Sequence, residues 1–327
     1  MEITPLLVVS CDGYADAWPF FFDLLDVYWR DCPFPKVLGS NHLSLERESV
    51  TTITIGTDRS WSSNVVKMLD RVEEMYTGAD YVLLFLEDFF LKETVNTARI
   101  LELVRIARSH EVGCLRLASG EPIALPPSTR LPGLPELGVL GSGEPYRITL
   151  QASIWRISTL RKLLSPGLSP WEFEQIGTQL SETFDAKLWA VTSPTINYDH
   201  AIEKGKWKPA GLQILKQAGL SPGDLRRQTF SNEQLAAHYA AVVVESELTH
   251  YRSAALRSFL AGQRREGLRC IYRHLRNFAP KPSDVGLGVA GVLGRAATRV
   301  ALGFYVKARL RDCARREAAK STSERSS

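Results

Sequence analysis

The chain has 327 residues, of which 44% are hydrophobic and 23% are charged; these values are ordinary for a soluble globular protein of one or two domains. Its first residues, MEITPLLVVS, lack the basic region of a signal peptide. The five cysteines are scattered without a CxxC pair, which argues against a zinc site and predicts reduced thiols in a cytosolic protein.

The net charge of +4 is unevenly distributed along the chain. Residues 252–316 contain fifteen Lys and Arg against three acids, and the last eleven residues are balanced, which leaves −8 for the first 251 residues. A basic segment of this kind suits an anionic lipid or a nucleic acid, or is simply a solvated helix face.

The first 117 residues alternate between apolar runs and amphipathic segments. We expect strands at 4–10, 36–39, 50–56, 81–86 and 112–117, and helices at 16–31, 60–76 and 95–110. Because the strands are continuous apolar runs, they predict an open α/β sheet, mostly parallel, with helices on both faces. Ligands on such sheets bind at the carboxyl ends of the strands, where Asp12, Asp58 and the Glu87–Asp88 pair fall.

After residue 118 the pattern is less regular. Residues 119–145 are rich in Pro and Gly and predict a long irregular loop, which could close over a substrate. We expect strands at 146–150, 187–192 and 195–198, and helices at 157–165, 169–184 and across most of 231–278.

A final segment, residues 285–320, has the pattern of one interfacial helix that does not span a membrane. Its apolar face would carry Val289, Val292, Ala296, Val300 and Phe304. We therefore divide the chain into an α/β domain, residues 1–215, and a helical, basic C-terminal extension, residues 216–327.

Glu87 and Asp88 end the apolar run YVLLFL and precede two phenylalanines. A carboxylate at a strand end can hold Mg²⁺ or Mn²⁺ against phosphate oxygens. Successive strand residues face opposite ways, so we expect only one of the pair to face a ligand directly. The alternative is a strand that ends in two solvated acids.

The segment GTDRSWSSN, residues 56–64, joins a strand to a helix. Such a turn presents backbone N–H groups and polar side chains, and Asp58, Trp61 and Asn64 could contact a nucleotide. A plain helix cap is the alternative interpretation.

The segment SPWEFE, residues 169–174, predicts a helix start with Ser169 as the N-cap and Pro170 at the first position. Glu172 and Glu174 then lie near the helix N-terminus, where the helix dipole alone favours acids. The functional interpretation is that one of them is a general base.

The segment EKGKWKP, residues 203–209, gathers Lys204, Lys206 and Lys208 beside Trp207. These lysines could neutralise a diphosphate leaving group, or belong to a solvated loop.

The ordered set VVSCDGYADAW, GTDRSWSSNV, YVLLFLEDFFL, TLQASIWRISTLRKLL, SPWEFE and EKGKW resembles bacterial glycosyltransferases of the GT-A fold, of the surface-polysaccharide (capsule and O-antigen) type. The resemblance covers roughly residues 4–215. It implies a GT-A-like (Rossmann-like) fold and a nucleotide-sugar donor, with Asp12 near the base and Asp58 and Asn64 near the nucleoside.

The resemblance also implies site residues. Asp88 matches the last acid of the family's Asp-x-Asp metal motif, although Leu86 stands at the position of its first. Glu174, preferred over Glu172, takes the place of the base in inverting members, and Lys204 and Lys206 would assist the leaving diphosphate.

The implied partners are a nucleotide-sugar donor, a saccharide or lipid-linked acceptor and, through the basic extension, the anionic inner face of the plasma membrane. No nucleic acid is expected, because nothing in the sequence resembles a nucleic-acid-binding module and the basic residues lie mostly in the extension rather than among the aromatic residues of the sheet. Two other functions stay open: a metal-dependent phosphohydrolase, and a non-catalytic scaffold that binds nucleotide sugar or membrane.

Overall fold

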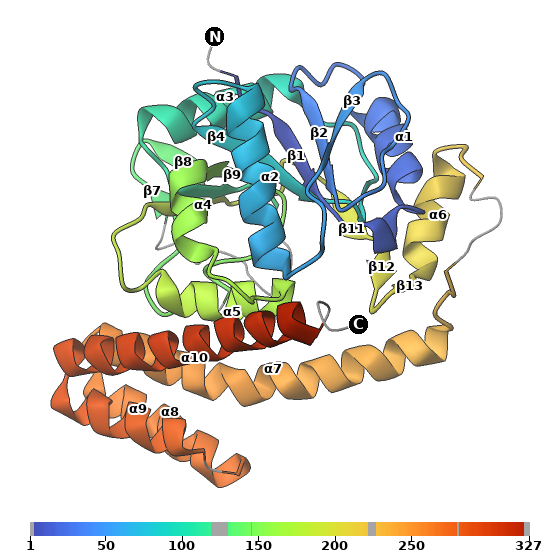
Figure 1. Ribbon diagram of the computed structural model, residues 1–327. Coiled ribbons are helices and arrows are strands. Elements are labelled where there is room, and N and C mark those ends of the chain that lie inside the picture. The colour runs from blue at the N-terminus through green and yellow to red at the C-terminus, as the bar shows by residue number, and fades with distance from the viewer. Residues whose placement is uncertain (1–2, 119–129, 145, 222–226, 280, 324–327) are drawn as a thin grey trace.

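The computed structural model describes residues 3–118, 130–144, 146–221, 227–279 and 281–323, without the side chains of residues 241–250, 253 and 323. These residues form an α/β body and a helical extension (Figure 1), as expected for the fold class. Helix α6 (Pro209–Gln217) runs across the boundary that we placed after residue 215, which remains a prediction.

A mixed nine-stranded sheet forms the centre of the described body, in the order β3-β2-β1-β4-β9-β6-β10-β8-β7. Its strands are β1 (Leu6–Val9), β2 (Lys36–Ser40), β3 (Val50–Thr54), β4 (Tyr81–Leu86), β6 (Cys114–Arg116), β7 (Arg130–Leu131), β8 (Leu134–Val139), β9 (Ser153–Arg156) and β10 (Leu188–Val191). Parallel pairs join β3, β2, β1 and β4, and also β6 and β10. Strand β9 lies antiparallel between β4 and β6, and β8 lies antiparallel beside β10, so most strands still run in one direction.

Helices cover both faces of this sheet because alternate strand residues point to opposite sides. Leu6 and Val8 of β1 belong to one apolar cluster and Leu7 and Val9 to another. The first cluster includes residues of α1 (Trp18–Tyr28), α3 (Thr97–Ser109) and α6. The second includes residues of α2 (Trp61–Met75), α4 (Ile157–Leu163) and α5 (Pro170–Leu180).

Two short ladders lie beside the sheet. Strand β5 (Phe89–Leu91) pairs antiparallel with β11 (Tyr198–His200), and β12 (Ile202–Glu203) pairs with β13 (Lys206–Trp207). A 3-10 turn, Asp12–Tyr14, follows β1. These pieces stand close to the carboxyl ends of β1 and β4 and shape the site described below.

Two expectations for residues 119–150 are wrong in the described part of that segment. Residues 130–139 form the β7–β8 hairpin, which turns at Gly133 with a positive φ; residues 119–129 lie outside the described part. Residues 146–150 form no strand, because the Ile148 N–H donates to Thr178 Oγ1 and the Leu150 N–H to Glu174 Oε1 instead of to a neighbouring strand.

The extension consists of α7 (Asn232–Leu260), α8 (Arg264–Asn277), α9 (Pro282–Leu293) and α10 (Arg295–Ser323), which pack below the body in Figure 1. The single helix expected over 285–320 is therefore wrong. It is divided at Gly294, whose φ of +109° is one that other residues rarely adopt.

The far end of α10 returns to the body. Arg316 Nη2 lies 2.5 Å from Glu172 Oε1, and Ser60 Oγ donates to Glu317 Oε1 at 3.0 Å. Gly167 packs so closely on α10 that an added Cβ would lie 2.0 Å from the Cys313 carbonyl oxygen. The last helix is thus attached beside the N-termini of α2 and α5.

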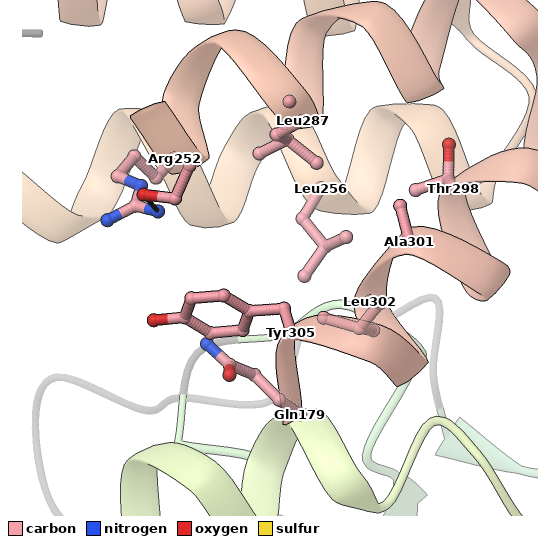
Figure 2. A pocket seen from close by; sticks show the side chains of 10 residues that line it. Gln179, Arg252, Leu256, Leu287, Thr298, Ala301, Leu302 and Tyr305 are labelled. Atoms are coloured by element: carbon pink, nitrogen blue, oxygen red, sulfur yellow. Dashed lines mark hydrogen bonds between the residues drawn. The ribbon is translucent and has the colours of Figure 1, made fainter. Parts of the chain in front are cut away.

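A cavity of about 260 Å³ lies where the extension meets α5 (Figure 2). Leu256 of α7, Leu287 of α9 and Tyr305 of α10 point into it, with Gln179 of α5 at its floor. Its one described cation, Arg252, is already paired with the buried Asp284 at 2.7 Å.

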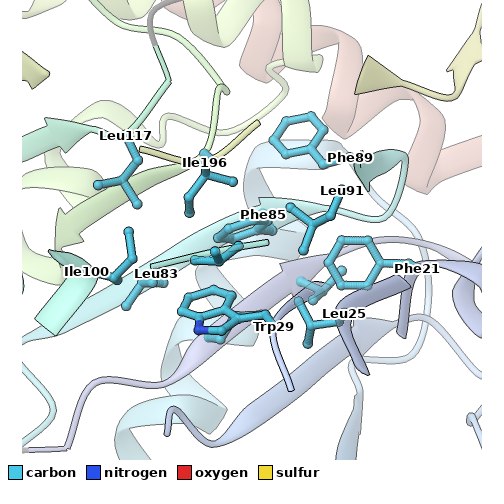
Figure 3. Close-up of a cluster of buried hydrophobic side chains, with 14 of the residues drawn as sticks. Phe21, Leu25, Trp29, Leu83, Phe85, Phe89, Leu91, Ile100, Leu117 and Ile196 are labelled. Atoms are coloured by element: carbon cyan, nitrogen blue, oxygen red, sulfur yellow. The ribbon is translucent and has the colours of Figure 1, made fainter. Parts of the chain in front are cut away.

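The apolar run of β4 is buried core, as Figure 3 shows. Leu83 and Phe85 of β4 lie in one cluster with Phe21 of α1 and with Trp29, the residue after that helix, and the cluster continues into β5. The residues that follow β4 therefore start from a rigid strand.

The helices in the described part of the chain include none that is both long and apolar enough to span a bilayer.

Candidate active site

A cavity of about 470 Å³ lies at the carboxyl ends of β1 and β4. Its walls come from the end of β1, the end of β4, the N-termini of α2 and α5, residues 200–204, and Leu150, which precedes β9. The polar and charged residues that line it are Ser10, Cys11, Tyr14, Asp58, Asn64, Glu87, Asp88, Glu174, His200, Glu203 and Lys204. The fold thus brings six separate parts of the sequence to one site, at the edge predicted for an α/β fold.

Glu87 and Asp88 both line this cavity, contrary to the expectation that only one would. The reason is local: β4 ends at Leu86, and residues 87 and 88 form a turn, so strand alternation no longer applies. Burial and the neighbouring Asp88 charge raise the pKa of Glu87 to about 8. Glu87 is therefore mostly protonated at neutral pH.

His200 faces Asp88 across the cavity wall, with Nδ1 3.4 Å from Asp88 Oδ2. Burial lowers the pKa of His200, but the hydrogen bond to Asp88 and its charge outweigh burial, so the net pKa is raised. Strand pairing sets this contact, because β11 places His200 opposite Phe89, the residue after Asp88. Sequence analysis missed His200, since no local motif marks it.

Glu174 lines the cavity from the first turns of α5. Its Oε1 accepts hydrogen bonds from Thr149 Oγ1 and from the Leu150 N–H, both at 2.8 Å. These two bonds hold the carboxylate in one orientation.

Glu172 does not line the cavity. It is the third helical residue of a capping box with Ser169, and it also pairs with Arg316 of α10. Burial raises its pKa, but the Arg316 and Ser169 hydrogen bonds outweigh burial and lower it. The structure therefore separates the two glutamates, which local sequence did not.

Asp58, Trp61 and Asn64 line the cavity together at the N-terminus of α2. Asn64 Nδ2 donates to Asp58 Oδ1 at 2.6 Å, and Ser60 caps the helix by accepting from the Ser63 N–H. The ring of Trp61 packs against Phe173 of α5 at 5.0 Å between centroids. This end of α2 presents polar groups and the positive end of a helix dipole to the cavity.

Asp12 lies just outside the lining. Its carboxylate accepts hydrogen bonds from the N–H groups of Asn41, His42 and Leu43 at 3.0–3.1 Å. Burial raises its pKa, but these three bonds outweigh burial and lower it. Its contacts hold the loop after β2 in place.

Of the two lysines predicted to assist a leaving diphosphate, Lys204 and Lys206, only one lines the cavity. Lys204 lines the cavity, with Nζ 5.9 Å from the ring centre of the exposed Trp171 at the cavity rim. Lys206 lies outside the lining, and its Nζ stands 5.4 Å over the ring of Phe230. Lys204 is directed by the β12–β13 turn, where it and Gly205 both have positive φ.

Tyr14 and Arg227 are a second pair that sequence analysis missed. Tyr14 lines the cavity, and the Arg227 guanidinium lies 4.6 Å from the centre of its ring. Arg227 also binds both oxygens of Asp16 and the carbonyl oxygens of Gly13 and Gly205. It therefore ties the turn after β1 to the β12–β13 turn.

Asp88 and His200 are the described residues best placed to hold a divalent metal. Among the described residues no group of three or more His, Cys, Asp and Glu is arranged to hold an ion. An ion at this pair therefore needs further oxygen ligands, which phosphate groups and water can supply. Asp88 and His200 alone could supply only two of the ligands of such an ion.

No protein-family model matches the chain, and no curated protein matches it. Two similar solved structures are both of S. aureus TarS, each with 12% identity and a TM-score of 0.42. The structure of TarS 1–349 is matched over 92% of this chain and 89% of that one. The other TarS structure is matched over 93% of this chain, which spans about half (55%) of its length. A likeness at this TM-score carries no argument about function.

Proposed function

We propose that the chain is a glycosyltransferase that moves a sugar from a nucleotide-sugar donor to a saccharide or lipid-linked acceptor, with inversion at the anomeric carbon. The observation that carries the proposal is the presence of Glu174, the Asp88–His200 pair and the N-terminus of α2 around one cavity. The sequence resemblance to GT-A glycosyltransferases, in particular those of surface-polysaccharide synthesis, supports the same function. We propose a cytoplasmic location for the site.

The donor side of the cavity is the part near β1, β4 and α2. Asp58, Asn64 and Trp61 would contact the nucleoside, while the α2 N-terminus and Lys204 stabilise the negative diphosphate. Asp88 and His200 would hold Mg²⁺ or Mn²⁺, which neutralises charge on a departing diphosphate when bound. Glu87, mostly protonated, would donate a hydrogen bond instead of adding a second negative charge.

The acceptor side is the part near α5. Glu174 would take the proton of the acceptor hydroxyl as the oxygen attacks the anomeric carbon and the bond to the diphosphate breaks. Thr149 Oγ1 and the Leu150 N–H fix the carboxylate from behind. Trp171, 60% exposed at the rim, offers an aromatic face on which the apolar face of a sugar ring can stack.

The first test is thermal unfolding of the chain with a panel of nucleotides and nucleotide sugars, each with and without Mn²⁺. A ligand at about 100 times its Kd stabilises the fold by roughly 2.7 kcal/mol, which is measurable. We expect one nucleotide class to raise the Tm, Mn²⁺ to increase the shift, and Asp88→Ala to abolish that increase. Glu93→Ala, at an exposed acid outside the cavity, is the control.

The outcomes separate the candidate functions. A chain that binds no nucleotide is not a glycosyltransferase of this kind. Binding without sugar transfer to any acceptor, or release of inorganic phosphate from phosphate esters, would favour the scaffold or the phosphohydrolase.

A further inference from the structure

The extension has an exposed apolar surface that the proposed reaction does not use. Of the sixteen large hydrophobic side chains exposed in the described part of the chain, eight lie between residues 268 and 304. Scattered exposed hydrophobics are normal, but a concentration of this kind marks a contact surface. Six of the eight lie on α9 and α10 and are 51–70% exposed: Val285, Val289, Val292, Leu293, Val300 and Phe304.

These six residues form two helical stripes, which we call the α9–α10 apolar face. On α9, residues 285, 289, 292 and 293 follow the three- and four-residue spacing that places side chains on one side of a helix. The opposite side of α9 is packed, since Asp284, Ala290 and Gly291 are buried there. Helix α10 begins directly after Gly294. On it, Val300 and Phe304 are exposed one helical turn apart, whereas Thr298, Leu302 and Val306 are buried.

Cations border the apolar face. Arg299 adjoins Val300, and Lys307 follows Phe304 by three residues, on the same side of α10. Both are exposed, and no described carboxylate forms an ion pair with either. The three acids of the region are already engaged: Asp284 with Arg252, Glu266 with Arg269, and Asp312 with Arg315.

We propose that the α9–α10 apolar face docks on an anionic lipid bilayer. Exposed apolar stripes bordered by cations are complementary to the two layers of a bilayer surface, the acyl boundary and the negative headgroups. Residues 252–316 contain fifteen Lys and Arg against three acids, so this region is complementary in charge to anionic headgroups. An uncharged apolar partner would not require this excess of positive charge.

The fold connects this surface to the candidate active site. Helix α10 runs from the apolar face to the N-terminus of α5, where Arg316 binds Glu172, a neighbour of the cavity-lining Trp171 (Figure 1). Phe304 and Arg316 are twelve residues apart, roughly 18 Å along a helix axis. A docked extension would therefore hold the cavity close to the bilayer surface, where a lipid-linked acceptor lies.

Co-sedimentation of the full chain with lipid vesicles tests whether the α9–α10 apolar face docks on an anionic bilayer. We expect binding to phosphatidylcholine vesicles that contain phosphatidylglycerol, and much weaker binding to pure phosphatidylcholine. The double variant Val292→Asp/Phe304→Asp should weaken partitioning by about tenfold or more, because charge replaces the inserted side chains. Arg299→Gln/Lys307→Gln should weaken it roughly fivefold per cation and reduce its salt dependence.

Val27→Asp, at an exposed valine on α1, is the matched control and should bind vesicles as the wild type does. Circular dichroism and the nucleotide-induced Tm shift show that each variant is folded. The proposal is wrong if the wild type does not bind anionic vesicles, or if the double aspartate variant binds them equally well. A wild-type dimer that ignores vesicles and dissociates on the same double substitution would identify the face as a contact between two copies.

Discussion

The α/β body and the helical extension present opposite surfaces. In the body, two large apolar clusters are buried against the sheet, and five acids line a cavity at the strand ends. In the described part of the extension, nine large apolar side chains are exposed, and the three acids between residues 252 and 316 all form ion pairs. The difference agrees with the two proposals made above, a small-molecule site in the body and a docking surface on the extension.

The two regions also differ in how their cores are built. The body has two large apolar clusters, one on each face of the sheet, and the second also takes in Leu302, Val306 and Cys313 of α10. The extension has a small cluster of its own around Ala255, Phe259, Cys270 and Ile271. We infer that α7, α8 and α9 can loosen without unfolding the body, whereas α10 is held in the body's second cluster, and the predictions below test that separation.

The largest effect is expected from two matched core substitutions. Phe173 of α5 and Phe259 of α7 are both fully buried, so replacing either with alanine should cost about 3–5 kcal/mol locally. Phe173→Ala should destabilise the body and so increase amide exchange in the sheet. Phe259→Ala should increase amide exchange in the extension and leave the amides of the sheet protected. Hydrogen exchange measures both; equal loss of sheet protection in the two variants would mean that the regions unfold together.

Glu87 gives a pH-dependent test of the body. Its folded pKa of about 8 lies above the ordinary value of 4.5, so its stability contribution is complete below pH 4.5 and is lost as pH rises through 8. Glu87→Gln removes that loss. The free energy of unfolding of Glu87→Gln, measured by urea unfolding, should therefore rise relative to that of the wild type as the pH is raised from 5 to 9. Glu48→Gln, at an exposed acid outside the cavity, is the control.

Gly167 tests the attachment of the extension. Gly167→Ala places a Cβ against the Cys313 carbonyl and also forces a positive φ, which alone costs about 1–2 kcal/mol. Gly219→Ala has a similar positive φ with open space around it, and so isolates the backbone cost. We expect the Gly167 variant to lose more Tm and to gain exchange in α10; equal Tm losses would show that the α10 contact is unimportant.

The smallest effect is expected at Glu172. Glutamine preserves a capping box, so Glu172→Gln removes mainly the ion pair with Arg316, whose side chain is 60% exposed. The cost should be about 1 kcal/mol or less, with the change in exchange confined to α10. A loss of several kcal/mol in urea unfolding would mean that this pair is the principal attachment of the extension.

Local patterns predicted the body of the fold because its strands and helices are strongly apolar or amphipathic. The ends of β1 and β4, and with them Glu87 and Asp88, followed from those patterns. The position of His200 did not, because the β5–β11 ladder joins residues more than a hundred apart. The prediction of a strand at 146–150 was wrong for a similar reason, since side chains of α5 accept the backbone hydrogen bonds of that segment.

The two glutamates of SPWEFE, Glu172 and Glu174, also could not be distinguished from local sequence patterns. Both suit a helix N-terminus, and sequence alone gave no physical reason to choose between them. The choice depends on Arg316, which comes from the far end of the chain, and on Thr149 and Leu150, which precede the helix. Long-range contacts decide which acid faces the cavity.

Sugar transfer by Glu174→Gln, compared with Glu172→Gln, tests the central claim most directly. Glutamine at 174 can still accept the Thr149 and Leu150 hydrogen bonds but cannot take a proton, so donor binding should persist while turnover falls about 10²- to 10⁴-fold. Glu172→Gln should turn over within a few-fold of wild type. With the donor found by the nucleotide panel, release of nucleoside diphosphate measures both. Near-normal turnover in Glu174→Gln would contradict the assignment of Glu174 as the base.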